Sequence, residues 1–109
     1  MSSSSDTQES IQRLQLFEQN LQALNMQKQQ FQAQLYEIEG ALKEIETAPS
    51  TYKIVGGIMI SMDKKTLQQE LSSRKEMLAL RVQTLEKQEK QLKEKAKKLQ
   101  DDVLTQTKA

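Results

Sequence analysis

Apolar residues recur along most of this chain at alternating spacings of three and four residues. This heptad spacing is typical of helices that each bury one narrow apolar stripe. One stripe falls within residues 8–47 and the other within residues 64–104. The first consists of Leu14, Phe17, Leu21, Leu24, Lys28, Phe31, Leu35, Ile38, Leu42 and Ile45, and the second combines Leu71, Leu78, Leu85, Leu92 and Leu99 with Gln68, Lys75, Val82, Glu89, Ala96 and Val103.

The two stripes come into register when the chain is folded about the midpoint between Gly56 and Gly57. Leu14 then meets Leu99, which means that the two helices run antiparallel and pack on each other within one chain. The same fold pairs Phe17 with Ala96, Leu21 with Leu92, Phe31 with Val82, Leu35 with Leu78, and Leu42 with Leu71.

Charged residues interrupt the stripes at two neighbouring layers. Lys28 shares a layer with Leu85, and Glu89 lies one turn away in the layer of Leu24. Two interpretations stay open. The two side chains could form an ion pair, which would penalise slipped registers, or both could reach outward to water. Lys75 has no such partner in the stripe, and we expect its side chain to extend into solvent.

Residues 51–62 change character and predict a β-hairpin, because they are β-branched and aromatic around a Gly-Gly pair. A three-residue loop, 55–57, would place Val55 and Met59 on the face opposite to the other apolar residues. A tighter loop of the two glycines alone would instead set Val55 opposite Ile58. The sequence leaves both loops open. In the first case the shared face holds Tyr52, Ile54, Ile58, Ile60 and Met62.

These elements predict an α-dominated fold, a long antiparallel two-helix coiled coil connected by a β-hairpin. Pro49 disfavours helical geometry in the preceding residue, so the first helix should end near Thr47. Asp63 should cap the second helix. We expect a disordered N-terminal tail (1–7), a helix (8–47), the hairpin (51–62), a helix (64–104) and a C-terminal tail (105–109), with residues 8–104 as one unit.

The predicted hairpin would be only marginally stable by itself in water, and its strand edges are unpaired. It could fold back on the bases of the helices, or it could pair with hairpins of other subunits and close an intersubunit β-barrel. The helices are too narrow to cover both faces of the hairpin, which favours assembly. The candidate assembly residues are Tyr52, Ile54, Val55, Ile58, Met59, Ile60 and Met62.

The opposite end of the coiled coil carries apolar residues outside the stripes, where we expect the helices to fray. Leu16 and Ile11 occupy outer heptad positions, and Leu104 follows the last stripe residue. A loosely packed apolar tip is a candidate site for weak contacts with apolar segments of other proteins. The candidate client-binding residues are Ile11, Leu14, Leu16, Phe17, Leu99, Val103 and Leu104.

Composition argues against an enzyme. The chain has 109 residues, of which 36% are hydrophobic and 4% aromatic, and it contains no Cys, His or Trp. It therefore lacks disulfides, the usual zinc ligands and the usual nucleophile–base pairs, and its three glycines fit no phosphate-binding loop. We expect no metal and no cofactor. The first six residues do not resemble a signal peptide, and no apolar run is long enough to span a bilayer, so we expect a cytoplasmic protein without a membrane partner.

Charge is distributed unevenly although the net charge is only +1. Residues 1–50 carry seven acids and three bases, and residues 51–109 carry eight acids and thirteen bases. Antiparallel pairing lays the acidic helix along the basic one, which favours orientation and register. The lysine-rich stretch 87–98 could alternatively bind nucleic acid, but glutamates interrupt it and it holds no aromatic residue for base stacking. We therefore expect no nucleic-acid partner.

Two sequence motifs resemble the β-type subunit of prefoldin, closest to the archaeal form. They are the hairpin motif Tyr52-Lys53-x-x-Gly56-x-Ile58-x-Ile60 and the run Leu80-Arg81-Val82-x-x-Leu85-Glu86-x-Gln88-Glu89. The resemblance extends from about residue 8 to residue 104. The chain offers one hairpin, as in the β-type, where the α-type has two. Lys28 and the serine-rich start match no role known for the family.

The resemblance implies a hetero-hexamer of two α-type and four β-type subunits, with a barrel platform of hairpins and projecting coiled coils. It further implies an ATP-independent chaperone, a holdase that binds unfolded proteins at the coiled-coil tips and delivers them to a group II chaperonin. The partners would then be an α-type subunit, further copies of this chain, unfolded clients and the chaperonin. The competing interpretation is a structural coiled-coil adaptor that binds no client.

Overall fold

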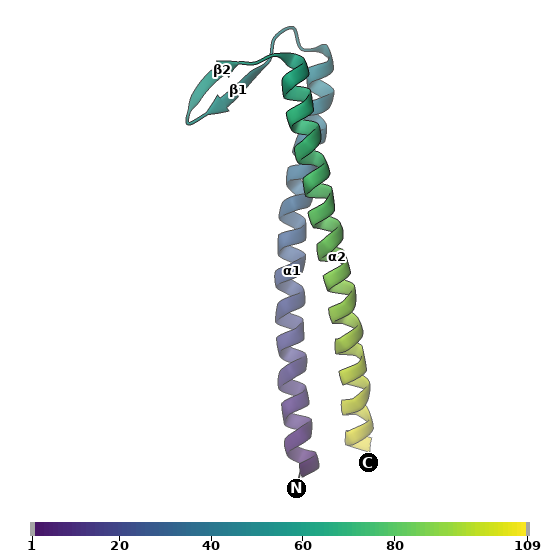
Figure 1. Cartoon of the computed structure of the whole chain (residues 1–109). Coiled ribbons are helices and arrows are strands. Elements are labelled where there is room, and N and C mark those ends of the chain that lie inside the picture. The colour runs from purple at the N-terminus through teal and green to yellow at the C-terminus, as the bar shows by residue number, and fades with distance from the viewer. Residues whose placement is uncertain (1, 109) are drawn as a thin grey trace. The chain divides into compact units, whose positions relative to one another are not determined.

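The computed structural model describes residues 2–108, which form two long helices joined by an antiparallel β-hairpin (Figure 1). Helix α1 spans Ser2–Thr47 and helix α2 spans Lys64–Lys108. Strands β1 (Tyr52–Val55) and β2 (Ile58–Ser61) lie between them. The predicted fold class is confirmed for the single chain. The barrel, which requires further chains, stays a prediction.

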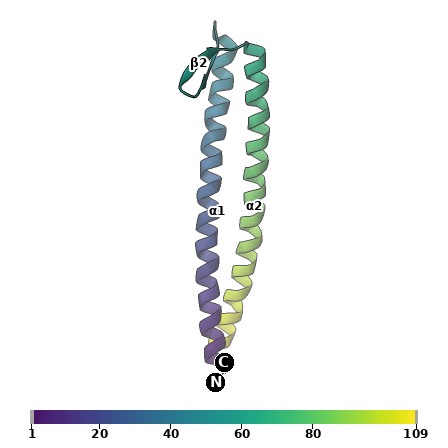
Figure 2. The same ribbon diagram turned by 60° about the vertical axis from the view of Figure 1, so that its left-hand side comes forward.

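The chain divides into two compact units. We call residues 2–29 with 83–108 the terminal unit, and residues 30–82, which include the hairpin, the central unit. Within each unit α1 and α2 lie side by side and run in opposite directions (Figures 1 and 2). The predicted antiparallel pairing is therefore present in both units.

Burial follows the predicted heptad register. Every stripe position of α1 is buried or half-buried, and so is every stripe position of α2 except Lys75. Even the best-covered side chains keep some exposure, because a pair of helices covers only one stripe on each member. Phe31 in the central unit also lies 5.5 Å, measured from the ring centroid, from the guanidinium carbon of Arg81. The buried apolar residues are Ile38, Ile45, Leu78, Val82 and Leu85, at 6–9% exposure.

The inner helix ends lie where the sequence predicts them. Asp63 caps α2, since its Oδ2 atom accepts hydrogen bonds from the backbone N–H and the hydroxyl of Thr66, both at 3.2 Å. Helix α1 ends at Thr47. The side chain of Lys64 donates a 2.8 Å hydrogen bond to the carbonyl of Glu46, which places a cation at the C-terminal end of α1.

The outer helix ends extend further than predicted. Over their described residues, the expected tails 1–7 and 105–109 are helical, while Met1 and Ala109 lie outside the described residues. These segments contain no Gly or Pro that would end a helix, and each added residue gains a hydrogen bond. The hydroxyl of Thr7 also donates to Oε1 of Gln106 at 3.2 Å, so residues from the two segments contact each other.

The hairpin has the tighter of the two turns that the sequence allowed. Val55 pairs with Ile58, and the intervening Gly56 and Gly57 have φ angles of 55° and 81°. Two successive positive φ angles are typical of a type I′ turn, whose twist suits a hairpin. At the base, the backbone N–H of Met62 donates to the carbonyl of Thr51 at 3.0 Å, and the hydroxyl of Thr51 donates back to the carbonyl of Met62 at 2.6 Å.

This register corrects the faces expected for a three-residue loop. Cross-strand partners share a face, so Ile54 lies with Met59 on one side of the hairpin. Val55 and Ile58 lie on the other side, together with the pair of Lys53 and Ile60. Both faces are still apolar, but Ile54 does not share a face with Ile58 and Ile60 as the longer loop would have required.

Candidate interaction surfaces

The hairpin surface comprises the seven predicted assembly residues, and the structure leaves nearly all of them exposed. Met62 at the hairpin base is half-buried. The other six have exposed fractions between 49% and 73%. The sheet of the described chain has two strands, so each strand also presents one unpaired edge. Apolar faces and free strand edges together form a surface suited to pairing with another chain. The exposed six are Tyr52, Ile54, Val55, Ile58, Met59 and Ile60.

A polar contact and an apolar groove connect the hairpin to the helices of the central unit. The Lys53 ammonium forms an ion pair and hydrogen bond with Oε1 of Glu70 on α2. Beside it lies a groove of about 600 Å³ at the hairpin base, with Ala41, Ile45 and Leu71 among the residues that line it. Sequence reasoning missed both features, because they depend on the direction in which the hairpin leaves the helices.

The tip surface comprises the seven predicted client-binding residues, all in the terminal unit. Ile11, Leu16 and Leu104 are exposed at 43%, 56% and 52%. The other four occupy stripe positions and are half-buried, and Phe17 and Leu99 line one common groove. The structure thus brings Phe17 and Leu99 together, whereas Leu16, outside the stripe, is exposed. The half-buried four are Leu14, Phe17, Leu99 and Val103.

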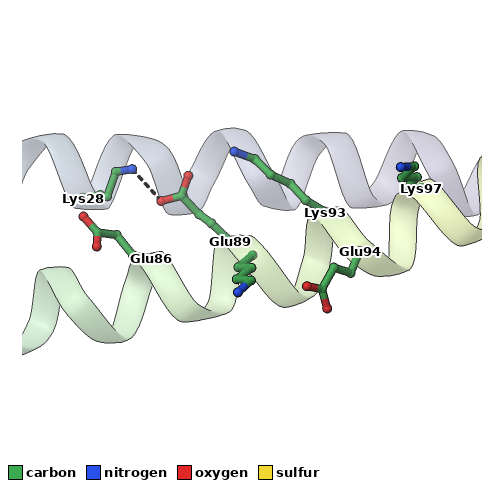
Figure 3. A pocket seen from close by; sticks show the side chains of 7 residues that line it. Lys28, Glu86, Glu89, Lys93, Glu94 and Lys97 are labelled. Atoms are coloured by element: carbon green, nitrogen blue, oxygen red, sulfur yellow. Dashed lines mark ion pairs between the residues drawn. The ribbon is translucent and has the colours of Figure 1, made fainter.

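A polar layer interrupts the apolar stripes within the terminal unit. Lys28 Nζ lies 2.9 Å from Glu89 Oε1, which decides between the two interpretations that the sequence left open (Figure 3). A groove of about 400 Å³ surrounds this pair, and Lys93 on its rim extends toward α1 (Figure 3). All seven residues that line the groove are charged, four lysines and three glutamates, so the groove does not suit an apolar ligand.

Lys75 differs from its sequence-based prediction. Its side chain is exposed, as expected, but its Nζ atom lies 4.0 Å from Oε1 of Glu39. Because both side chains are about half exposed, this ion pair contributes little to stability. The heptad pattern missed the partner because Glu39 lies outside the stripe.

Side-chain groupings that bind metal ions and helices that span membranes would each point to a further function of the described residues. No group of three or more His, Cys, Asp or Glu side chains among residues 2–108 is placed to hold a metal ion. Over the same residues, no helix combines the length and apolar character needed to cross a membrane. The informative surfaces are therefore the hairpin surface and the tip surface.

Comparison with known sequences gives one consistent family. The family described as Prefoldin subunit matches residues 8–108. The prefoldin subunit beta of Pyrobaculum neutrophilum is 44% identical over 86 residues, covering 76% of this chain and 68% of that protein. The prefoldin subunit beta of Methanothrix thermoacetophila is 38% identical over 99 residues, covering 88% of this chain and 82% of that protein.

Comparison with solved structures agrees. The crystal structure of the prefoldin beta subunit from Thermococcus strain KS-1 superposes with a TM-score of 0.86 and 36% sequence identity. The match covers 92% of this chain and 90% of that chain.

Proposed function

The chain belongs to the prefoldin subunit family as a β-type subunit, and we propose that it is part of an ATP-independent holdase that binds unfolded proteins at its tip surface. The general role of a chaperone subunit follows from the family. Client binding by named residues, delivery to a group II chaperonin and a cytoplasmic location are the further parts of the proposal.

The observation that carries the proposal is the exposure of apolar side chains on the tip surface. Ile11, Leu16 and Leu104 are each about half exposed, next to half-buried stripe residues. An unfolded client has no fixed shape that precise polar contacts could recognise, so binding must depend on apolar area. Complete burial of one such side chain contributes roughly 1.5–3 kcal/mol. One tip binds weakly, and several tethered tips raise the effective concentration for the same client.

The hairpin surface supports the assembly that this mechanism requires. β-type subunits of the family form hetero-oligomers with other prefoldin subunits, and we propose an α-type subunit and further copies of this chain as the partners. Hairpins that pair edge to edge would cover apolar faces now exposed in the single chain and would remove the free strand edges. A hetero-hexamer with a barrel platform then presents several tip surfaces to one client.

One experiment tests both the assembly of the subunits and the holding of an unfolded client. The mass of the purified protein is measured alone and after mixing with a candidate α-type subunit, and the resulting complex is added to a chemically denatured protein on dilution. We expect a defined hetero-oligomer that suppresses light scattering from the aggregating client without ATP. A complex that assembles but leaves aggregation unchanged would favour the structural adaptor instead.

A further inference from the structure

A small groove in the terminal unit combines apolar and cationic side chains. It has a volume of about 240 Å³ and is lined by Arg13, Phe17, Lys95, Lys98, Leu99 and Asp102. Phe17 and Leu99 are half-buried stripe residues of the tip surface, whereas Arg13, Lys95 and Lys98 are exposed. The groove therefore has an apolar floor and a rim with three cations and one carboxylate.

Within the described residues, no ion pair holds any of the three rim cations. Among the ion pairs of the described residues, none involves Arg13, Lys95 or Lys98, and the rim carboxylate of Asp102 has no ion-pair partner either. The groove therefore presents a net positive charge, three cations against one carboxylate, beside apolar side chains. A ligand that supplies carboxylates at this rim would gain the charge pairs that the fold leaves unmade.

The preceding part of α2 carries four further exposed lysines. Lys87, Lys90, Lys93 and Lys97 are exposed and lack an ion pair in the described part of the chain. Two glutamates lie among these lysines: Glu89 is buried and already paired with Lys28, whereas Glu94 is exposed and offsets part of their charge. Lys90, Lys93 and Lys97 line the groove around Lys28 and not the groove at Phe17, so the charge that a client meets at Phe17 is that of the rim residues Arg13, Lys95 and Lys98.

We propose that this groove selects non-native protein segments in which apolar side chains are flanked by carboxylates. The inference rests on the proposed holding function and adds a substrate class to it. The apolar side chains of the client would cover Phe17 and Leu99, and its Asp or Glu residues would lie against the rim cations. Charge complementarity identifies this occupant, because a purely apolar segment would leave the rim unpaired and a purely anionic polymer would leave the floor uncovered.

Labelled unstructured peptides test the proposal on the assembled complex. Three peptides share the same apolar residues and differ only in their flanks, which are Glu, Gln or Lys. In fluorescence anisotropy at low salt, we expect the Glu-flanked peptide to bind about tenfold more tightly than the Lys-flanked one, as three exposed charge pairs would give. At about 1 M salt, where charges are screened within about 3 Å, the preference should vanish.

Matched variants locate the effect. The triple variant Arg13→Gln, Lys95→Gln, Lys98→Gln should lose the preference for Glu flanks and keep its affinity for the Gln-flanked peptide. The control variant Lys43→Gln, Lys65→Gln, Arg74→Gln removes the same number of charges from exposed positions of the central unit. This control should retain the full preference.

The possible outcomes distinguish a failure of charge selection from a failure of client holding. If the Gln-flanked peptide binds but the Glu-flanked and Lys-flanked peptides bind equally tightly, the proposed charge selection is wrong and the proposed client holding is retained. If no peptide binds, holding itself is contradicted. Tighter binding of polyglutamate or single-stranded RNA than of the Glu-flanked peptide would overturn the proposal, because the apolar floor would then play no part.

Discussion

Lys28 Nζ and Glu89 Oε1 lie 2.9 Å apart between α1 and α2, inside a mainly apolar seam. Their side chains are 21% and 9% exposed, so the glutamate is the more deeply buried partner. The close atoms form an ion pair but do not meet hydrogen-bond geometry, which leaves Glu89 Oε1 without a hydrogen-bond donor among the described residues. Lys28 is therefore the ion-pair partner of this carboxylate among the described residues.

Removal of Lys28 should cost more stability than removal of Glu89. Lys28→Leu leaves a buried carboxylate without its ion-pair partner, and we expect the free energy of unfolding to fall by about 3 kcal/mol. Glu89→Leu should cost less, because the lysine stem can turn its ammonium to water. The double variant Lys28→Leu, Glu89→Leu should equal or exceed the wild type. Urea unfolding followed by circular dichroism measures all three, and equal stability of Lys28→Leu and wild type would contradict this account.

The positive φ angles of Gly56 and Gly57 make the hairpin turn sensitive to side chains. A Cβ atom at either glycine would meet no atom within 4 Å, so any cost arises from the backbone conformation alone. Gly57→Val should destabilise the hairpin by roughly 1–2 kcal/mol and weaken assembly. Gly56→Asn should be tolerated, since Asn adopts this conformation readily in such turns. Size-exclusion chromatography with the α-type partner compares them, and equal assembly of Gly57→Val and wild type would argue against this turn in the complex.

Substitution on the hairpin surface should separate folding from assembly. Ile58 and Ile60 lie on one face and are 65% and 49% exposed in the single chain. Ile58→Lys with Ile60→Lys should therefore leave both helices intact and yield a monomer that joins no complex. Circular dichroism tests whether the helices stay intact, and mass measurement tests whether the variant stays monomeric. Normal assembly of the double variant would show that the hairpin is not the platform.

Cysteine pairs test the register that the sequence predicted. Cysteines at Leu21 and Leu92, or at Leu35 and Leu78, should form a disulfide within one chain, because facing seam positions bring Cβ atoms within disulfide range. Cysteines at Leu21 and Leu78 should not. Non-reducing gel electrophoresis distinguishes the products by mobility, and crosslinks found only between chains would contradict the intramolecular pairing.

The sequence predicts the seam well because burial there follows a simple period. Each apolar heptad position from Leu14 to Val103 is buried or half-buried, as the spacing indicates. The sequence did not decide which side chains share a face of the hairpin, because the answer depends on whether the loop has two or three residues. A shift of the strand register by one residue moves every side chain of that strand to the other face. Only the observed pairing of Val55 with Ile58 decided it.

Other features could not be read from spacing. Long side chains reach several partners, so neither the ion pair of Lys53 with Glu70 nor that of Lys75 with Glu39 follows from a heptad pattern. The cationic rim around Phe17 was also missed, since its lysines and arginine come from two helices and their proximity requires the folded register. Extension of the helices over the predicted tails reflects the absence of any residue that would stop them.

Client holding by a truncated complex tests the central claim most directly. Removal of residues 1–17 together with 99–109 deletes the tip surface and leaves the hairpin and the seam between residues 18 and 98. Mass measurement first establishes that the truncated chain still assembles with its partner. Aggregation of a chemically denatured client is then followed by light scattering, with the full-length complex as control. The account predicts that the truncated complex assembles but no longer suppresses aggregation. Equal protection by the truncated and full-length complexes would contradict it and would place client binding on the platform or along the remaining helices.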